Sequence, residues 1–167
     1  MSPRRVTYLT ILAGSTAWCA AIILAPVFAA GPLPGAGRLL YEFFRPICHQ
    51  LDDHSFHIGS AAFAVCARCF GIYGGFLAGA LSYPFVRDLR SPSMPSRRVL
   101  AVALAPMLFD VACGMLGVYD NTNLTRVITG GIFGCAAPWF IIPGAVDAVS
   151  QFLTSPTPSP TPTIAKG

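Results

Sequence analysis

Four stretches of about 20 largely apolar residues divide the chain, and each is long enough to cross a bilayer as a helix. The stretches run over residues 8–30, 69–86, 99–118 and 127–149. Pro138 and Pro143 lie inside the last stretch and predict a kink there, because proline removes a backbone donor from the helix. The pattern predicts an all-α membrane protein, a four-transmembrane-helix up-down bundle that forms one domain over residues 1–153.

The first apolar stretch has two interpretations. Arg4 and Arg5 precede it, and residues 27–29 at its end have the pattern of a signal cleavage site. A secretory signal, however, has an apolar core of about 7–15 residues, which is shorter than this stretch. The length favours a retained span, and a cleaved signal is the alternative.

Residues 31–68, between the first two spans, are more polar and contain one amphipathic run. Large apolar residues recur there at helical spacing, between charged residues at positions 38, 42 and 45. They are Leu39, Leu40, Phe43 and Phe44. The run predicts a short interfacial helix that lies in the membrane surface and ends before Pro46. A helix packed on top of the bundle fits the run equally well.

The composition agrees with the membrane class. The chain is 54% hydrophobic and 11% charged, whereas an average soluble domain is about 25% charged. This balance excludes a soluble domain with a charged surface and a disordered chain, and the small net charge of +4 argues against nucleic-acid binding. Residues 154–167 differ from the rest, because their alternating prolines predict an extended tail.

The basic residues predict the orientation. If both termini are cytoplasmic, seven of the eleven Lys and Arg residues lie on that side, among them Arg4, Arg5 and the block from Arg87 to Arg98. Cytoplasmic loops carry such an excess. We therefore expect a multi-pass protein of the inner (cytoplasmic) membrane, with residues 31–68 on the outer side.

Small residues mark packing faces within the spans. Gly71, Gly75 and Gly79 are spaced by four, so they share one helix face that another backbone can approach closely. Gly130 and Gly134 have the same spacing in the fourth span. We expect these faces to build the bundle.

Most of the chemistry of the chain is concentrated in 22 residues. All three histidines and three of the six cysteines lie there: Cys48, His49, His54, His57, Cys66 and Cys69. A Cys-x-x-Cys pair presents two sulfurs on one side of a turn, and thiolates with imidazole are typical zinc ligands. The sequence predicts a zinc site of three sulfurs and one imidazole, from any of the three histidines. Arg68 and Tyr73 are expected to surround the site without ligating the metal.

The cysteines also allow an interpretation without metal. In an oxidising compartment Cys66 and Cys69 can form a structural or redox-active disulfide, with Cys48 as its exchange partner. The four-span quinone-linked thiol oxidases are similar in placing a Cys-x-x-Cys pair near the outer end of a span. They use a second cysteine pair, however, and residues 119–126 in the second outer loop contain no cysteine. Quinone is a cofactor only under this alternative.

Asp110 is an isolated carboxylate in the third apolar stretch. An ionisable group inside a span faces the interior and either finds a partner or has a function. Arg126 can form an intramembrane polar pair with it, although about two helical turns separate the two positions. Arg68 is the second candidate partner. A structural pair is favoured over a role in binding protons or ligands.

These motifs resemble the signature of an uncharacterised family of small prokaryotic membrane proteins. The signature reads CHQ, RSF and CxRCxGxYxG, and it matches residues 48–50, 54–56 and 66–75. His54 stands where that family has arginine. The continuation of the signature fits Asp110, Asn123, Arg126, Thr129 and Gly130. The resemblance implies that the cysteine cluster, Asp110 and Arg126 belong to one set of functionally related residues, with Asn123 beside the site. It implies no activity.

Together these features favour a structural or accessory subunit of a larger membrane complex, with a zinc site at its outer face, over an enzyme. The expected partners are the lipid bilayer and other membrane-protein subunits. One alternative is a thiol–disulfide oxidoreductase that uses Cys66 and Cys69. Another is a transporter or sensor in which Asp110 and the histidines handle metal ions or protons.

Overall fold

The computed structural model describes residues 2–88 and 94–154, most of which are helical. The elements in chain order are α1 (Pro3–Ala30), α2 (Pro34–Phe44), the short 3-10 helix η1 (Asp52–His54), β1 (His57–Ile58), β2 (Ala61–Ala62), α3 (Ala67–Val86), α4 (Arg97–Met115), α5 (Asn123–Ala136) and α6 (Pro138–Thr154). The expected Pro-rich tail, from residue 155 onward, and Arg90 lie outside the described residues.

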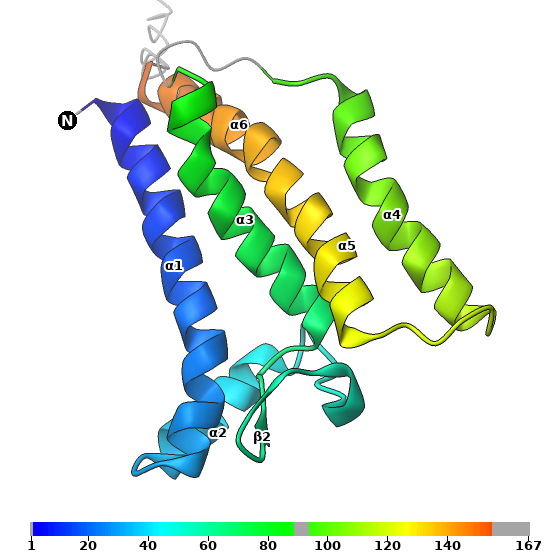
Figure 1. Cartoon of the computed structure of the whole chain (residues 1–167). Helices are drawn as coiled ribbons and strands as arrows, with labels where there is room; N and C mark the ends of the chain where they lie inside the picture. The colour runs from blue at the N-terminus through cyan, green and yellow to red at the C-terminus, as the bar shows by residue number, and fades with distance from the viewer. Residues whose placement is uncertain (1, 89–93, 155–167) are drawn as a thin grey trace, which may run out of the picture.

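Four segments of the described chain are long and apolar enough to cross a membrane, which confirms the predicted spans. They are α1, α3, α4 and the consecutive helices α5 and α6 taken together. Successive spans run in opposite directions, so the N-terminus and the end of α6 lie at the same end of the bundle (Figure 1). The opposite end carries the connection between α1 and α3, residues 31–66, which we call the cap. The up-down bundle is therefore confirmed.

The fourth span is interrupted at Ala137, next to Pro138, where the sequence predicts a kink. α5 ends at Ala136 and α6 begins at Pro138, with Ala137 between them. Proline has no N–H to donate and its ring crowds the preceding turn, so Pro138 fits the first position of a new helix better than the middle of an old one. The break lets α5 pack on α3 and α4 while α6 packs mainly on α1 and α3.

Glycines bring α3 and α5 into backbone contact. A side chain at Gly71, Gly75 or Gly79 would overlap backbone atoms of α5. Conversely, a Cβ at Gly130 would lie 2.5 Å from the Arg68 carbonyl oxygen. The predicted packing role of both glycine faces is confirmed, and the interface fixes the start of α3 against α5.

α2 is a helix, as the amphipathic run predicts, and it packs against the end of α1. Phe44 is fully buried, and the rings of Phe43 and Phe44 meet Trp18 of α1 edge to face. A Cβ at Gly37 would lie 2.5 Å from the backbone nitrogen of Ala29, so glycine is needed for this approach. The placement of α2 in the membrane surface stays a prediction.

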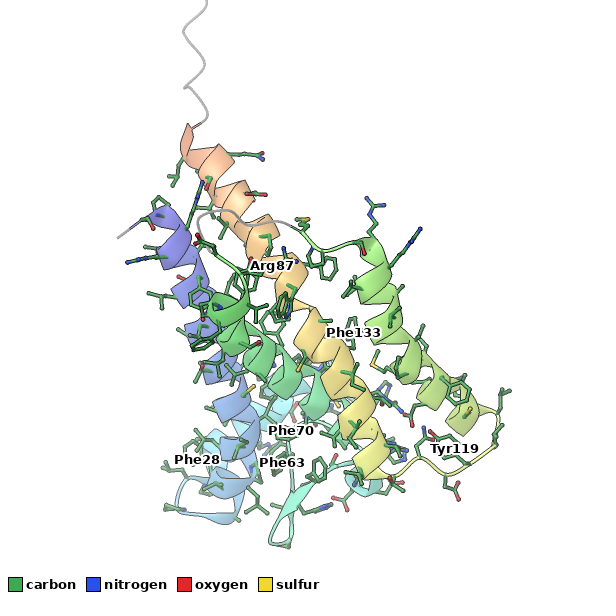
Figure 2. The ribbon with its side chains drawn as sticks, turned by 45° about the horizontal axis from the view of Figure 1, so that its top comes forward. Phe28, Phe63, Phe70, Arg87, Tyr119 and Phe133 are labelled. Atoms are coloured by element: carbon green, nitrogen blue, oxygen red, sulfur yellow. The ribbon has the colours of Figure 1, made fainter. Side chains whose placement is uncertain are left out.

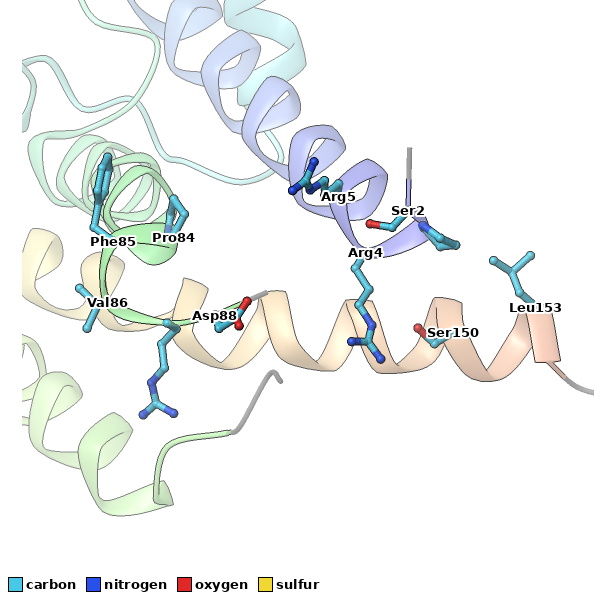
Figure 3. Close-up of a pocket in the computed structure, with 11 residues that line it drawn as sticks. Ser2, Arg4, Arg5, Pro84, Phe85, Val86, Asp88, Ser150 and Leu153 are labelled. Carbon is cyan, nitrogen blue, oxygen red and sulfur yellow. The ribbon is translucent and has the colours of Figure 1, made fainter. Parts of the chain in front are cut away.

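Basic residues gather at the end of the bundle that carries the N-terminus. Arg4 and Arg5 of α1 line a pocket of about 900 Å³, together with Pro84 and Phe85 of α3 and residues of α6 (Figure 3). This is the end for which the sequence predicts the cytoplasm. The cap lies at the other end, so the basic and the cysteine-rich parts of the chain are separated by the length of the bundle (Figure 1).

Candidate metal centre

The cap holds Cys48 in an apolar core. Cys48 follows α2 and is only 5% exposed. Its cluster of buried residues contains Ile22 of α1, Phe44 of α2 and Val65 at the end of the cap. Aromatic rings continue this packing onto α3, where Phe63 of the cap meets Phe70 with ring centroids 5.2 Å apart (Figure 2). The surrounding side chains therefore fix the position of the Cys48 sulfur.

The start of α3 brings two further sulfurs to Cys48. Cys66 is the N-cap of α3 and Cys69 lies in its first turn, so the Cys-x-x-Cys spacing places both at the cap. The three sulfurs lie within 4.8 Å of one another. The backbone N–H of Cys66 donates to Cys48 Sγ at 3.1 Å, which is the type of contact that supports a thiolate.

The three sulfurs fit a metal ion. In a tetrahedral site with Zn–S bonds of about 2.3 Å, neighbouring sulfurs lie about 3.8 Å apart, so shifts of about 1 Å or less suffice for ligation. Hydrogen bonds with Cys48 and then Cys69 lower the pKa of the Cys66 thiol far below its ordinary value, and burial opposes them only in part. The thiolate is the form that binds metal. A Cys triad that can hold a metal ion is therefore present.

Hydrogen bonds from Gln50 hold the cap in place around this cluster. Its backbone has a φ of +52°, which is uncommon outside glycine. The side-chain Nε2 donates to the carbonyls of Tyr41 and Ala64, each at 2.8 Å. These bonds tie α2 to the segment before Cys66. The sequence does not predict this role of Gln50, because a polar residue close to a cysteine does not show which carbonyls its side chain will reach.

The three histidines are not brought to the sulfurs. His49 is exposed. The Nε2 atom of His54 lies 3.4 Å from Asp53, and that of His57 lies 3.0 Å from Asp52. Among the described residues, the ligand-type groups that meet at this spacing are the three cysteines. The acidic neighbours give two of the imidazoles local partners, and the choice of an imidazole ligand stays a prediction.

Asp110 lies in a polar cluster at the same end of the bundle. Its side chain is 2% exposed, and Arg68, which is 25% exposed, donates to its Oδ2 at 2.6 Å. Tyr119, in the loop between α4 and α5 (Figure 2), donates to Oδ1 at 2.5 Å. Asn121 donates to the Asp110 backbone carbonyl at 2.6 Å. The hydrogen bond to Asp110 also raises the pKa of Tyr119.

The partner of Asp110 is thus Arg68, the second candidate, rather than Arg126. The glycine contact at position 130 draws the Arg68 backbone onto α5, and α4 is the other neighbour of α5. Arg68 therefore reaches Asp110 directly. The Nε atom of Arg126 is buried, with no hydrogen-bond partner among the residues that the structure describes.

The remaining predicted neighbours lie around the cluster in different ways. Tyr73 packs one turn below Cys69, with its ring 5.6 Å from that of Trp18. Asn123, at the start of α5, donates to the carbonyl of Ser55 in the cap at 3.1 Å. Tyr119 and Asn121 were missed by sequence reasoning. The available signal was their polarity in a short loop between two apolar spans.

A pocket of about 580 Å³ joins the two clusters. It is bordered by the cap, by α3, by α4 and by the start of α5, and the residues on its wall include His54, Cys66, Arg68, Tyr119, Asn121 and Arg126. Cys66 thus belongs both to the sulfur cluster and to the pocket wall.

Comparisons with known proteins agree with this picture of a membrane protein. The chain is 38% identical over 141 residues to an uncharacterised protein of Methanocaldococcus jannaschii, covering 81% of this chain and 90% of that protein. It is 32% identical over 89 residues to an uncharacterised protein of Methanothermobacter thermautotrophicus, covering 52% of this chain and 77% of that protein. No solved structure gives a significant match. Residues 48–140, more than half of the chain and the part that contains the whole cysteine cluster, match one protein family, and the chain therefore belongs to the family described as "Predicted membrane protein (DUF2085)".

Proposed function

We propose that the protein binds one zinc ion through Cys48, Cys66 and Cys69, and that the ion fastens the cap to the start of α3. The observation that carries the proposal is the convergence of three sulfurs, from two separate segments of the chain, within 4.8 Å. Three thiolates are soft ligands that suit zinc among the common metals. Cys48 is held by α2 and Gln50, whereas Cys66 and Cys69 are held by α3.

The role that follows is structural or accessory. The described chain is four spans and a small cap, and the metal would hold the cap in one position at the outer face of the inner membrane. An accessory subunit presents such a surface to other membrane subunits. If this role is correct, gentle extraction retains partner proteins with this chain, whereas recovery as a monodisperse single chain counts against it.

Metal analysis of the purified protein tests the zinc site directly. We expect one zinc per chain, and we expect Cys66→Ser to lose it because two thiolates hold zinc much more weakly than three. Cys135→Ser is the matched control, since Cys135 lies on α5 away from the cluster. The variant protein should therefore keep its zinc. Wild-type protein that is folded, reduced and free of metal after purification with zinc would overturn the proposal.

One observation favours a second candidate, a thiol–disulfide oxidoreductase. Cys66 combines a lowered pKa with a place on a pocket wall, as a reactive thiol does. In this reaction a Cys66–Cys69 disulfide takes two electrons and two protons from two substrate thiols, which become a disulfide. A quinone then accepts the two electrons and two protons and restores the Cys66–Cys69 bond. Mass spectrometry that finds this disulfide in metal-free protein, together with quinone reduction, would favour the enzyme over the zinc site.

A further inference from the structure

The proposed zinc site has one coordination position that the described cysteines do not fill. A tetrahedral ion has four ligands, and three sulfurs converge here. A zinc ion with three protein ligands keeps its fourth position for water or a small molecule. Any ligand from outside the chain must therefore reach the cluster.

The pocket beside Cys66 supplies that route. Its volume of about 580 Å³ lies within the range of about 300–1,000 Å³ typical of small-molecule sites. Cys66 is the cysteine of the cluster that lines it, so the pocket lies directly beside the cluster. A molecule bound there lies beside Cys66, one of the three sulfur residues.

The wall of this pocket carries one positive charge that has no ion pair among the described residues. Arg68 is neutralised by Asp110. Arg126 has no ion pair among the described residues, and its buried Nε–H lacks an acceptor. Two carboxylates, Asp53 and Asp120, also line the pocket, but both are exposed, and the side chain of Asp53 is 78% exposed and paired with His54. An anionic group thus finds its best partner in the Arg126 guanidinium, since Arg68 already has a carboxylate partner.

We propose that this pocket binds a small thiol that carries a carboxylate. Its sulfur completes the coordination of the metal, and its carboxylate accepts hydrogen bonds from Arg126. Sulfur matches the softness of a three-thiolate site. In this exchange a metal–sulfur bond forms, a bound water leaves, the thiol proton passes to solvent and no electron is transferred. The inference rests on the proposed metal site and adds the class of its ligand.

Cobalt substitution tests the inference, because the absorption of Co²⁺ reports the number of sulfur ligands and the geometry. Two probes, mercaptoacetate and 2-mercaptoethanol, are titrated into the reduced, Co²⁺-loaded protein in detergent under anaerobic conditions. We expect both to change the spectrum, and mercaptoacetate to do so at an about tenfold lower concentration, since only it has a carboxylate for Arg126. This comparison uses the wild-type protein and needs no variant.

Two variants then assign the carboxylate contact. Arg126→Gln should remove the preference for mercaptoacetate while keeping the cobalt spectrum of the thiol-free protein. Arg45→Gln is the control, because Arg45 is an exposed residue of the cap whose partner is Glu42, and it should keep the preference.

Each of the other outcomes of the cobalt experiment contradicts one specific part of the proposal. Failure to bind Co²⁺ overturns the proposed metal site, and the inference with it. Bound Co²⁺ whose spectrum ignores both thiols leaves the metal site in place and overturns the inference alone, because a protein group such as His54 then fills the fourth position. Equal response to both thiols, unchanged in Arg126→Gln, overturns the carboxylate site.

Discussion

Arg68 is the residue at which the cysteine cluster and the intramembrane carboxylate meet. It stands between Cys66 and Cys69 in the sequence, and its guanidinium pairs with Asp110 of α4. Its backbone carbonyl touches α5 at Gly130. One side chain therefore links the first turn of α3 to a neighbouring span. Loss of the ion pair should therefore alter the positions of the Cys66 and Cys69 sulfurs. A change at these sulfurs should likewise alter the ion pair.

At this scale we predict that Asp110→Asn destabilises the protein. The substitution keeps the shape of the side chain but leaves the Arg68 guanidinium half-buried without a counter-charge, at a cost of about 2 kcal/mol. Thermal unfolding in detergent, followed by tryptophan fluorescence, should show a lower midpoint. The double variant Asp110→Asn with Arg68→Gln should recover part of the loss, because it leaves no unpaired charge.

Asp120→Asn is the matched control for this prediction. Asp120 lies in the adjacent loop and is exposed, so its loss should leave the midpoint unchanged. If Asp110→Asn unfolds at the wild-type temperature, the ion pair does not stabilise the fold, and a role in handling protons or ligands becomes the better explanation for a carboxylate in a span.

At the scale of elements, the α3–α5 interface depends on glycine at defined positions. We predict that Gly75→Ala lowers stability by about 1–3 kcal/mol, because the added methyl overlaps the backbone of Gly131 and pushes the helices apart. The measurement is the unfolding midpoint in detergent.

Gly74→Ala offers a control on the same helix, since its Cβ would meet nothing within 4 Å. Alanine also has the higher helix propensity, so this variant should be as stable as the wild type or slightly more stable. Equal losses at both positions would mean that the contact with Gly131 is not the cause of the loss at position 75.

The elements show which features can be predicted from a sequence of this kind. The spans were predictable because a helix that crosses the bilayer must be long and apolar. The glycine face was predictable because residues spaced by four, such as Gly71, Gly75 and Gly79, lie on the same side of a helix. The Cys66–Cys69 pair is also a local signal. The partner of Asp110 depends on how α3 is rotated and how closely it approaches α5. The directions of His54 and His57 depend on the path of the cap, so local spacing did not predict them.

At the scale of the whole molecule, polar chemistry and basic charge lie at opposite ends. The cap end carries the cysteine cluster and the Asp110 cluster, whereas Arg4 and Arg5 lie at the end with the N-terminus (Figure 1). An excess of basic residues marks the cytoplasmic side of a membrane protein. This asymmetry supports the proposed orientation, with the cap outside.

We therefore predict that a peptide tag inserted between Gly59 and Ser60, in the exposed turn that joins β1 to β2, is cut by protease added to intact spheroplasts. A tag placed before Ser2 should be cut only after the membrane is permeabilised, because the N-terminus is cytoplasmic in this orientation. The reverse pattern of cleavage would invert the topology, and cleavage of both tags from outside would indicate that α1 does not cross the membrane.

The ion pair between α3 and α4 also has a consequence for biosynthesis. A carboxylate deep in a span raises the cost of membrane insertion by up to about 3 kcal/mol, and Asp110 lies roughly 8 Å from the end of α4. The ribosome makes α3 first, so Arg68 is already in place when α4 leaves the insertion machinery. We infer that α4 enters the bilayer with the help of α3 rather than as an independent segment. The order of the helices along the chain then matters for assembly, because the late span α4 is accepted once the earlier span α3 carries its counter-charge.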